Sequence, residues 1–289
     1  MHVALIGIGL MGLPMAKRLC EAGLQPHLWN RTRAKAEPLA ALGARVHDTV
    51  AQAVRDADIV VTMLEDGDVV ESVLFEQGLA QALQPGSLLI DMSSIQPAQA
   101  RSHGQRLAAL GVGYLDAPVS GGTLGAEAGN LAIMAGGTEE AFERARAVLT
   151  HFGRPTLVGP TGSGQLAKLA NQMIVGVTIG VVAEALLLCA KGGADMAKVK
   201  EAVTGGFADS RILQVHGQRM IERDFAPRGR ISVQLKDMRN AMATAQELGF
   251  DAPITGLLET LYASAGENGL SGMDQAAFFA ELARRNGMA

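Results

Sequence analysis

Residues 161–193 read TGSGQLAKLANQMIVGVTIGVVAEALLLCAKGG, and this stretch predicts one long helix. Ser163 is a residue type that caps helix starts by accepting a backbone N–H bond, and Gly192 is one that ends helices in a left-handed conformation. The residues between them include no proline and would form roughly 40 Å of helix at about 1.5 Å per residue. A helix of this length indicates a rod that joins two parts of the protein.

One polar cluster interrupts the apolar surface of this predicted helix. Lys168, Asn171 and Gln172 are spaced i, i+3 and i+4, so they share one face near the helix start. The run Met173–Ala190 beyond them is apolar enough to raise the question of a membrane span. Because Glu184 interrupts this run and the polar cluster precedes it directly, we interpret it as a buried interdomain helix.

Composition narrows the class of protein. A chain of 289 residues favours about two domains, and the net charge of −4 without a Lys/Arg run argues against a nucleic-acid partner. The scattered histidines lack metal-ligand spacing, so we expect no metal site. Cys20 and Cys189 lie far apart in apolar helical patterns, which indicates buried thiols of a cytoplasmic protein rather than a disulfide. A strand pattern begins at Val3 with no basic region before it, so no signal peptide is expected.

The N-terminal segment predicts a dinucleotide-binding turn. The apolar run Val3–Ile6 is typical of a buried parallel strand, and GIGLMG follows it at once and opens a helical pattern. In this context the first glycine allows a tight turn, the second lets the backbone approach a pyrophosphate, and the third lets helix and strand pack closely. The helix N-terminus attracts the anion. The residues expected to bind the cofactor here are Gly7, Ile8, Gly9, Leu10, Met11 and Gly12.

The end of the second predicted strand indicates which dinucleotide is used. The strand His27–Trp29 leads into Asn30, Arg31 and Thr32, whereas an NAD-specific site usually has an acid here for the ribose 2′-hydroxyl. An acid would repel a 2′-phosphate, and an arginine would pair with it. The sequence therefore predicts NADP(H) in preference to NAD(H), although NAD(H) stays possible.

The alternation of strands and helices continues through the first half of the chain. Strand patterns recur at 59–63, 88–91, 113–116 and 131–135, and the loops after such strands line the cofactor crevice of a doubly wound sheet. One loop contains Ser120, Gly121 and Gly122, which offer adjacent backbone N–H groups and a hydroxyl that suit a carboxylate. Thr138 is expected to cap the helix that follows the last of these strands.

Beyond the long helix the pattern becomes helical throughout. The predicted helices are Met196–Thr204, Ser210–Glu222, Ser232–Leu248, Ile254–Ala265 and Gln275–Asn286. Asp195 and Asp274 are expected to start helices, and Gly205, Gly249 and Gly266 to end them. The sequence therefore predicts a Rossmann-type α/β domain at 1–162, an interdomain helix at 163–192 and an all-α domain at 193–289.

Five motifs in order cover essentially the whole chain. They read GIGLMGLPMAKRL at 7–19, DMSSIQP at 91–97, DAPVSGGTLGAEAG at 116–129, GSGQLAKLANQ at 162–172 and LKDMRNA at 235–241. Together they resemble the 3-hydroxyacid (β-hydroxyacid) dehydrogenase family, which includes enzymes of the tartronate semialdehyde reductase and 3-hydroxyisobutyrate dehydrogenase types. The resemblance implies a 6-phosphogluconate dehydrogenase-like fold. It also implies NADP(H)-dependent hydride transfer between nicotinamide and a small carboxylate-bearing alcohol or aldehyde.

The resemblance implies a role for each matching residue. Lys168 would be the catalytic acid/base, and Asn171 and Gln172 would orient substrate and lysine. Many relatives have two asparagines at this point, whereas the tartronate semialdehyde reductases share the Asn-Gln form. The substrate carboxylate would be held by Ser120, Gly121 and Gly122. Cofactor contacts are implied for Gly7, Gly9, Gly12, Met63, Leu64, Ser94 and Lys236.

Elementary chemistry agrees with Lys168 as the proton donor. Nicotinamide supplies a hydride, so the protein must supply a proton and hold the carbonyl group. An ammonium near a helix N-terminus faces the positive end of the dipole, and burial disfavours its charge further. Both effects are expected to lower the pKa of Lys168 toward the range of a general acid–base.

Several alternatives stay open on the sequence alone. Other substrates within the same chemistry are glyoxylate, succinic semialdehyde, methylmalonate semialdehyde, L-serine and 3-hydroxypropionate. An imine reductase is disfavoured because Lys168 is retained. A non-catalytic dinucleotide-binding module is disfavoured because the Lys-x-x-Asn-Gln set is intact, and an S-adenosylmethionine-binding protein would not explain the helical half. The apolar length of Met173–Ala190 also predicts a homodimer or homotetramer.

Overall fold

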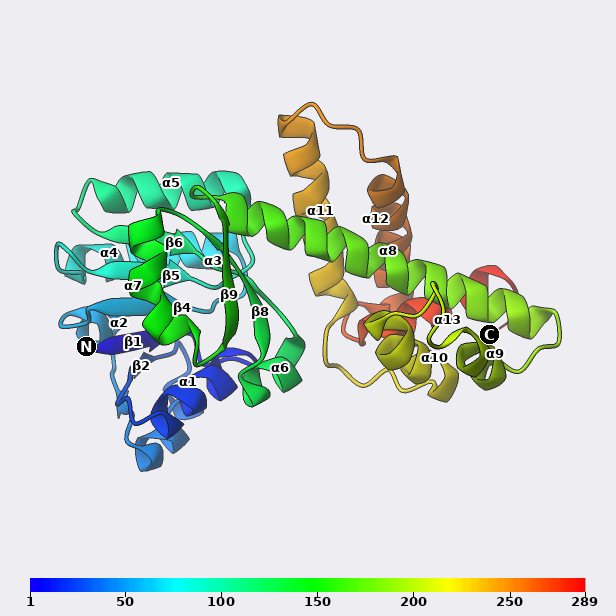
Figure 1. Cartoon of the computed structure of the whole chain (residues 1–289), viewed down its shortest axis with the longest axis horizontal. Helices are drawn as coiled ribbons and strands as arrows, with labels where there is room; N and C mark the ends of the chain where they lie inside the picture. Colours follow the sequence, from blue (N-terminus) through cyan, green and yellow to red (C-terminus); the bar gives the residue numbers. More distant parts are fainter. Residues whose placement is uncertain (289) are drawn as a thin grey trace. The chain divides into compact units, whose positions relative to one another are not determined.

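The computed structural model describes residues 1–288, which fall into two compact units (Figure 1). Unit 1 is Met1–Lys168, and unit 2 begins at Leu169. The long helix α8, Ser163–Lys191, contributes its first turns to unit 1 and the remainder to unit 2. The predicted long helix is therefore present as one unbroken element.

Unit 1 is built on a nine-stranded sheet whose first six strands are all parallel. Their order, β3-β2-β1-β4-β5-β6, is the order of a dinucleotide-binding sheet. These six strands are Arg45–Val46 (β3), His27–Trp29 (β2), Val3–Ile6 (β1), Ile59–Thr62 (β4), Leu88–Asp91 (β5) and Gly113–Asp116 (β6). The sheet continues with β8 (Leu131–Gly136), which is antiparallel to β6 and pairs with β7 (Val119–Ser120) and β9 (Gly153–Gly159).

The parallel strands are apolar because both faces of the sheet are covered. Val3 and Leu5 of β1 belong to one core cluster, and Ala4 and Ile6 belong to the other. Helices α1 (Gly12–Glu21) and α7 (Glu139–Leu149) cover the first face. The helices that cover the second face are α2 (Val50–Val54), α3 (Gly67–Glu71), α4 (Leu79–Ala82) and α5 (Pro97–Ala108).

Unit 2 is a helical bundle with its own core, and no strand occurs between residues 169 and 288. Ile179, Val182 and Leu186 of α8 pack into this core, where the rings of Tyr262 and Phe278 stack at 4.4 Å. The other helices are α9 (Met196–Val203), α10 (Gln218–Glu222), α11 (Ile231–Glu247), α12 (Pro253–Ala265) and α13 (Phe278–Arg285). The predicted all-α character of the second half is confirmed.

Several local predictions about helix ends are confirmed and two are wrong. Thr138, Asp195 and Asp274 cap helices through their side chains, as expected. Ser163 does not cap α8, because the helix starts at Ser163 itself and the amides of Gly162 and Gln165 donate to Asp116. The left-handed residue after α8 is Gly193 rather than Gly192, because the helix continues to Lys191. Helix α12 ends at Ala265 with Gly266 in the C-cap position, as predicted, and a π-helical turn, Gly266–Leu270, follows it.

Two further features of the described residues bear on the sequence predictions. Helix α8 alone is long and apolar enough to cross a membrane by length and composition, and 39% of its most apolar window is buried in the protein. Core helices of ordinary folded domains pass the same test. Cys20 and Cys189 are free thiols, and both are only half-buried, whereas the sequence predicted buried thiols.

Candidate cofactor and catalytic site

The glycine loop between β1 and α1 is shaped by two close backbone contacts. Gly7 has a φ of +102°, and a Cβ added there would collide with the Met63 carbonyl oxygen. A Cβ at Gly12 would collide with the carbonyl oxygen of Gly7. The first and third glycines are therefore required by the turn and by the packing of α1 against the strand end.

The second glycine differs, because a Cβ at Gly9 would meet no protein atom within 4 Å. Met11, the N-cap residue of α1, makes no side-chain capping bond, and the first turn of the helix has no acidic residue. Unsatisfied N–H groups at a helix start attract an anion, and an open approach at Gly9 leaves room for a pyrophosphate. The loop thus fits a dinucleotide cofactor.

The Asn30 side chain holds the turn that follows β2. Its Oδ1 accepts a hydrogen bond from the Ile8 amide at 2.9 Å, and its Nδ2 donates to the Thr32 carbonyl at 2.8 Å. Arg31 is exposed and makes no ion pair among the described residues. Arg33 is already paired, with Glu37 at 3.2 Å and Asp48 at 2.7 Å. Of the two arginines, Arg31 is the one available to a phosphate.

Polar groups at the ends of β4 and β5 tie two predicted cofactor loops together. The Thr62 hydroxyl donates to Asp91 Oδ1 at 2.8 Å, and the Ser93 amide donates to the same oxygen at 3.0 Å. The Ser93 hydroxyl accepts from the Leu64 amide at 2.9 Å. The segments that contain Met63, Leu64 and Ser94 are therefore fixed to one another within unit 1.

The predicted carboxylate loop lies where β7 meets α6, Gly122–Ala128. Gly121 has a φ of +141° and Gly122 a φ of +64°, and both are exposed. A Cβ at Gly122 would meet no protein atom within 4 Å. Successive amides in such a turn form a concave donor surface that suits an anion, so the geometry is compatible with the predicted role of Ser120, Gly121 and Gly122.

Lys168 is half-buried in the second turn of α8. The first turn is held by Asp116 at the end of β6, which accepts from the Gly162 amide at 2.7 Å and the Gln165 amide at 2.9 Å. Burial raises the pKa of Asp116 to about 6, although these two bonds favour its charged form. Asp116 and Gln165 lie in quoted motifs, but sequence reasoning assigned neither of them a role.

In unit 2 a buried polar network joins α8 to α11. The Gln172 Nε2 donates to Asp237 Oδ2 at 2.6 Å and to Gln234 Oε1 at 3.3 Å. The Asn171 side-chain Nδ2 donates to Gln172 Oε1 at 2.8 Å, and Lys236 Nζ lies 3.3 Å from Asp237 Oδ1. The structure thus brings together Asn171, Gln172 and Lys236, all of which were predicted, and adds Gln234, which was not.

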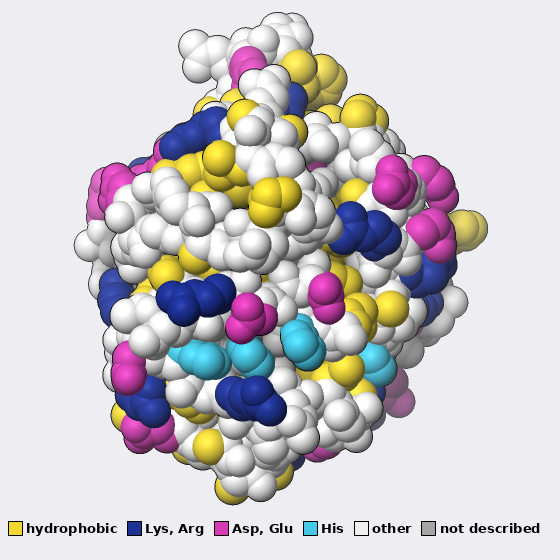
Figure 2. All heavy atoms as spheres, turned by 90° about the vertical axis from the view of Figure 1, so that its left-hand side faces the viewer, with side chains coloured by type: hydrophobic (Ala, Val, Ile, Leu, Met, Phe, Trp, Pro, Cys, Tyr) yellow, Lys and Arg dark blue, Asp and Glu magenta, His cyan; other side chains and the backbone are white. Residues whose placement is uncertain are grey.

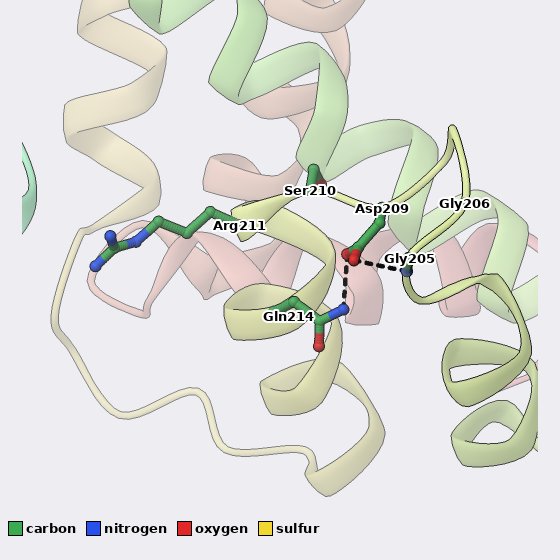
Figure 3. A pocket seen from close by; sticks show the side chains of 6 residues that line it. All are labelled: Gly205, Gly206, Asp209, Ser210, Arg211 and Gln214. Carbon is green, nitrogen blue, oxygen red and sulfur yellow. Dashed lines mark hydrogen bonds between the residues drawn. The ribbon is translucent and has the colours of Figure 1, made fainter.

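A separate hollow of about 410 Å³ lies in unit 2 at the loop before α10 (Figure 3). In the close-up, Asp209 accepts from the Gly205 amide at 2.9 Å and from Gln214 Nε2 at 2.7 Å, while Arg211 points away. Its walls contain none of the residues of the glycine loop, the carboxylate loop or helix α8 that were predicted to bind cofactor or substrate. The lining residues are Gly205, Gly206, Asp209, Ser210, Arg211 and Gln214.

Family models match both halves of the chain. Residues 2–162 match the NAD-binding domain of 6-phosphogluconate dehydrogenase, and residues 162–282 match the NAD-binding domain of NADP-dependent 3-hydroxyisobutyrate dehydrogenase. The two matches meet at residue 162, just before α8 begins. They support a nicotinamide cofactor for this chain.

Individual relatives are similar along nearly their whole length. The 2-hydroxy-3-oxopropionate reductase of Escherichia coli is 43% identical, with 98% of this chain and 97% of that protein covered. The 3-hydroxyisobutyrate dehydrogenase of Pseudomonas aeruginosa is 35% identical, with 90% of each chain covered. A solved structure of Mycobacterium tuberculosis 3-hydroxyisobutyrate dehydrogenase with L-serine has a TM-score of 0.88 at 32% identity and covers 97% of this chain and 98% of its own. The fold, the glycine loop and these similarities lead to one conclusion: the chain belongs to the 3-hydroxyacid dehydrogenase family of NAD(P)-dependent oxidoreductases.

Proposed function

We propose that this enzyme reduces tartronate semialdehyde (2-hydroxy-3-oxopropionate) with NADPH and also runs in reverse on the corresponding hydroxyacid. The observation that carries the substrate assignment is the 43% identity, over almost the full length, to a 2-hydroxy-3-oxopropionate reductase. The Asn171-Gln172 pair supports it, because the resemblance associates this form with the tartronate semialdehyde reductases. In unit 2 the pair is built into the network with Gln234 and Asp237.

The proposed chemistry balances with one hydride and one proton. The glycine loop with Gly7, Gly9 and Gly12 would hold NADPH, and when bound this cofactor would supply the hydride that reduces the aldehyde carbon. The carbonyl oxygen becomes an alkoxide, and the Lys168 ammonium donates a proton to it, so that a primary alcohol is released and solvent returns the proton to the lysine. The amides of Gly121 and Gly122 and the Ser120 hydroxyl hold the substrate carboxylate through charge-assisted hydrogen bonds.

The preference for NADP(H) is part of the proposal and is supported by the turn after β2. Asn30 places no negative charge there, and Arg31 is exposed without an ion pair among the described residues. A 2′-phosphate near this turn would pair with the guanidinium. We further propose a cytoplasmic location, which the two unpaired cysteines support.

A substrate and cofactor screen tests the function directly. The purified enzyme is offered tartronate semialdehyde, methylmalonate semialdehyde, glyoxylate and succinic semialdehyde, each with NADPH and with NADH, and absorbance of the reduced nicotinamide is followed. L-Serine, 3-hydroxyisobutyrate and 3-hydroxypropionate are offered with the oxidised cofactors. The proposal expects the highest kcat/KM for tartronate semialdehyde with NADPH. A higher kcat/KM for another acid refutes the substrate assignment, and a higher value with NADH refutes the cofactor assignment.

A further inference from the structure

The first turn of α8 carries a glutamine whose side chain is fully buried and bonded to the loop after β5. The Gln165 Nε2 donates to the Ser93 carbonyl at 2.8 Å, and its Oε1 accepts from the Ile95 amide at 3.1 Å. These two backbone groups lie on either side of Ser94, the residue predicted to contact the cofactor. A primary amide is the side chain that can both donate to a carbonyl and accept from an amide at such a site.

The helix turn that carries Gln165 is itself held in place by contacts with the ends of strands β6 and β8. Asp116 accepts from the Gly162 and Gln165 amides, so its carboxylate satisfies two of the donors that a helix start leaves without partners. A Cβ added to Gly164 would collide with the Met134 carbonyl oxygen and lie 2.6 Å from the Asp116 carbonyl oxygen. The backbone of the turn is therefore pressed against the ends of β6 and β8, with no room to shift toward them.

The same hydrogen-bonded chain continues to the other predicted cofactor loop. The residue whose carbonyl Gln165 holds, Ser93, also accepts the Leu64 amide through its hydroxyl and donates its own amide to Asp91. All of these bonds are within unit 1, and Gln165, Ser93 and Asp91 are at most 1% exposed. Asp91 Oδ2 has no hydrogen-bond partner among the described residues, but each bond made by Gln165 and Ser93 would leave a buried polar group unpaired if it broke, and this cost makes the local structure rigid.

We propose that Gln165 is a positioning residue that locks the backbone around Ser94 to the helix turn carrying Lys168. Lys168 is three residues further along α8, about 4.5 Å along the axis, so the amide of Gln165 links the cofactor loop to the proton donor across a single helix turn. Asp116 fixes the turn from the strand side. The inference rests on the proposed catalytic role of Lys168.

The decisive variants are Gln165→Met and Gln165→Glu. Met has a similar length and no amide, so both bonds to the Ser94 segment are lost. Glu keeps an acceptor for the Ile95 amide but points its second oxygen at the Ser93 carbonyl, a repulsion that protonation of the carboxyl relieves. Gln105, which is exposed on α5, supplies the matched controls Gln105→Met and Gln105→Glu.

The proposal expects kcat to fall about 10- to 100-fold in Gln165→Met, since small misplacements of reacting groups cost this much. The Kd for NADPH should stay within about threefold and the far-ultraviolet circular dichroism should be unchanged. In Gln165→Glu the loss relative to the parent should shrink as pH falls from 8 to 6. The Gln105 variants should match the parent throughout.

Specific outcomes overturn the proposal. A folded Gln165→Met with kcat within twofold of the parent refutes it. If that variant does not fold, a constant ratio of Gln165→Glu to parent kcat between pH 8 and pH 6 refutes it. If the parent enzyme has no activity on any of the substrates, that result refutes the proposed function and not the role of Gln165. In that case amide hydrogen exchange decides the link on its own: residues 163–168 must exchange faster in Gln165→Met, and unchanged exchange refutes it.

Discussion

The side chain of Gln172 is long enough to cross from α8 to α11, where its amide meets Asp237 and Gln234. Asparagine is shorter by one methylene group and would not span the distance that Gln172 covers in its 2.6 Å contact with Asp237. Many relatives have a second asparagine where this chain has Gln172. The extra length of Gln172 is what lets its side-chain amide reach Gln234 on α11. The carboxylate of Asp237 in turn pairs with Lys236.

Lys168→Ala tests the proton donor at the level of one side chain. Removing general acid–base help is expected to lower kcat by about 10²–10⁴-fold, while NADPH binding, measured by fluorescence, stays near the parent value. Lys198→Ala, at an exposed lysine on α9, is the control and should leave kcat unchanged. Retention of kcat within a few-fold in Lys168→Ala would show that another group donates the proton.

Arg31→Ala tests the cofactor preference. Loss of a charge-assisted bond to the 2′-phosphate, about 1.5–3 kcal/mol, should raise KM for NADPH by roughly 10- to 150-fold. KM for NADH, which has no 2′-phosphate, should hardly change. Arg55→Ala, at an exposed arginine in the same unit, is the control. Equal effects on both cofactors would contradict a phosphate contact by Arg31.

At the level of elements, the two ends of the parallel sheet carry opposite kinds of titratable group. Buried carboxyls, Asp91 and Asp116, sit at the carboxyl ends of β5 and β6. At the amino ends, His2 precedes β1 and His27 begins β2, and their rings stack at 6.4 Å; the His27 ring lies 4.9 Å from that of His47, which follows β3. Figure 2 shows a row of histidine side chains on this face, with basic and acidic side chains around it.

The Asp116 carboxyl should make the protein less stable as pH rises. Because burial raises its folded-state pKa from 3.8 to about 6, the folded protein holds this proton more tightly than the unfolded chain. Its contribution is fully present below pH 4 and is lost as pH rises through 6, by about 3 kcal/mol at most. Urea unfolding from pH 4 to 7 measures this slope, which Asp116→Asn should flatten.

A cap without a titratable group provides the control for that slope. Thr138 caps α7 through the Ala141 amide at 3.1 Å, so Thr138→Ala should lower stability by about 1 kcal/mol equally at every pH. If Asp116→Asn shifts the whole curve in the same uniform way, the carboxyl is not the source of the pH dependence.

His27 and His47 should make the protein less stable as pH falls, which is the opposite of the effect of Asp116. Burial lowers the pKa of His27 first, and the positive charges of His47, Arg45 and His2 lower it further against the opposing charge of Asp56. For His47 the pKa is lowered by burial, then by Arg33 and Arg45, with Asp48 opposing. Because the unfolded chain binds protons at these rings more tightly than the folded protein does, their contribution to stability is fully present above pH 6.5 and is lost as pH falls below it. In the double variant His27→Gln, His47→Gln, the free energy of unfolding in urea should no longer fall in this way between pH 7 and pH 5. If it falls as much as in the parent, these histidines are not the cause.

The sequence predicted elements well where the signal is local. Strands β1, β4 and β5, whose sequences are almost continuously apolar, were found because all of their residues are buried. Helix caps such as Asp195 were found because the cap and its partners are neighbours. Strand β9 was missed because it contains Pro155 and alternates with exposed residues at the end of the sheet. The contacts of Asp116 with α8 join residues 46 and 49 positions apart, so no local pattern reveals them.

For the whole molecule, the surface of α8 in unit 2 bears on assembly. Ile174, Val181 and Leu188 recur every seven residues on one face and are 68%, 58% and 73% exposed. Large apolar side chains exposed in a row mark an interaction surface. We propose that a second copy of the chain covers this face in a homodimer or homotetramer, as the sequence predicts.

Charge placed on this face should dissociate the assembly. The double variant Val181→Asp, Leu188→Asp is expected to run as a monomer in light scattering, whereas Leu42→Asp, at an exposed leucine of unit 1, keeps the parent mass. A parent protein that is already monomeric at micromolar concentration refutes the proposed assembly.

The doubly bonded Asn30 also bears on how this enzyme could evolve. An Asn codon becomes an Asp codon through one nucleotide change, and aspartate here would favour NAD. Yet Asn30 donates to the Thr32 carbonyl as well as accepting from Ile8, so an ionised aspartate would set a carboxylate oxygen against that carbonyl. The single substitution Asn30→Asp would therefore destabilise the turn after β2. For this reason we expect that a change of cofactor preference at this position would need a second, compensating substitution.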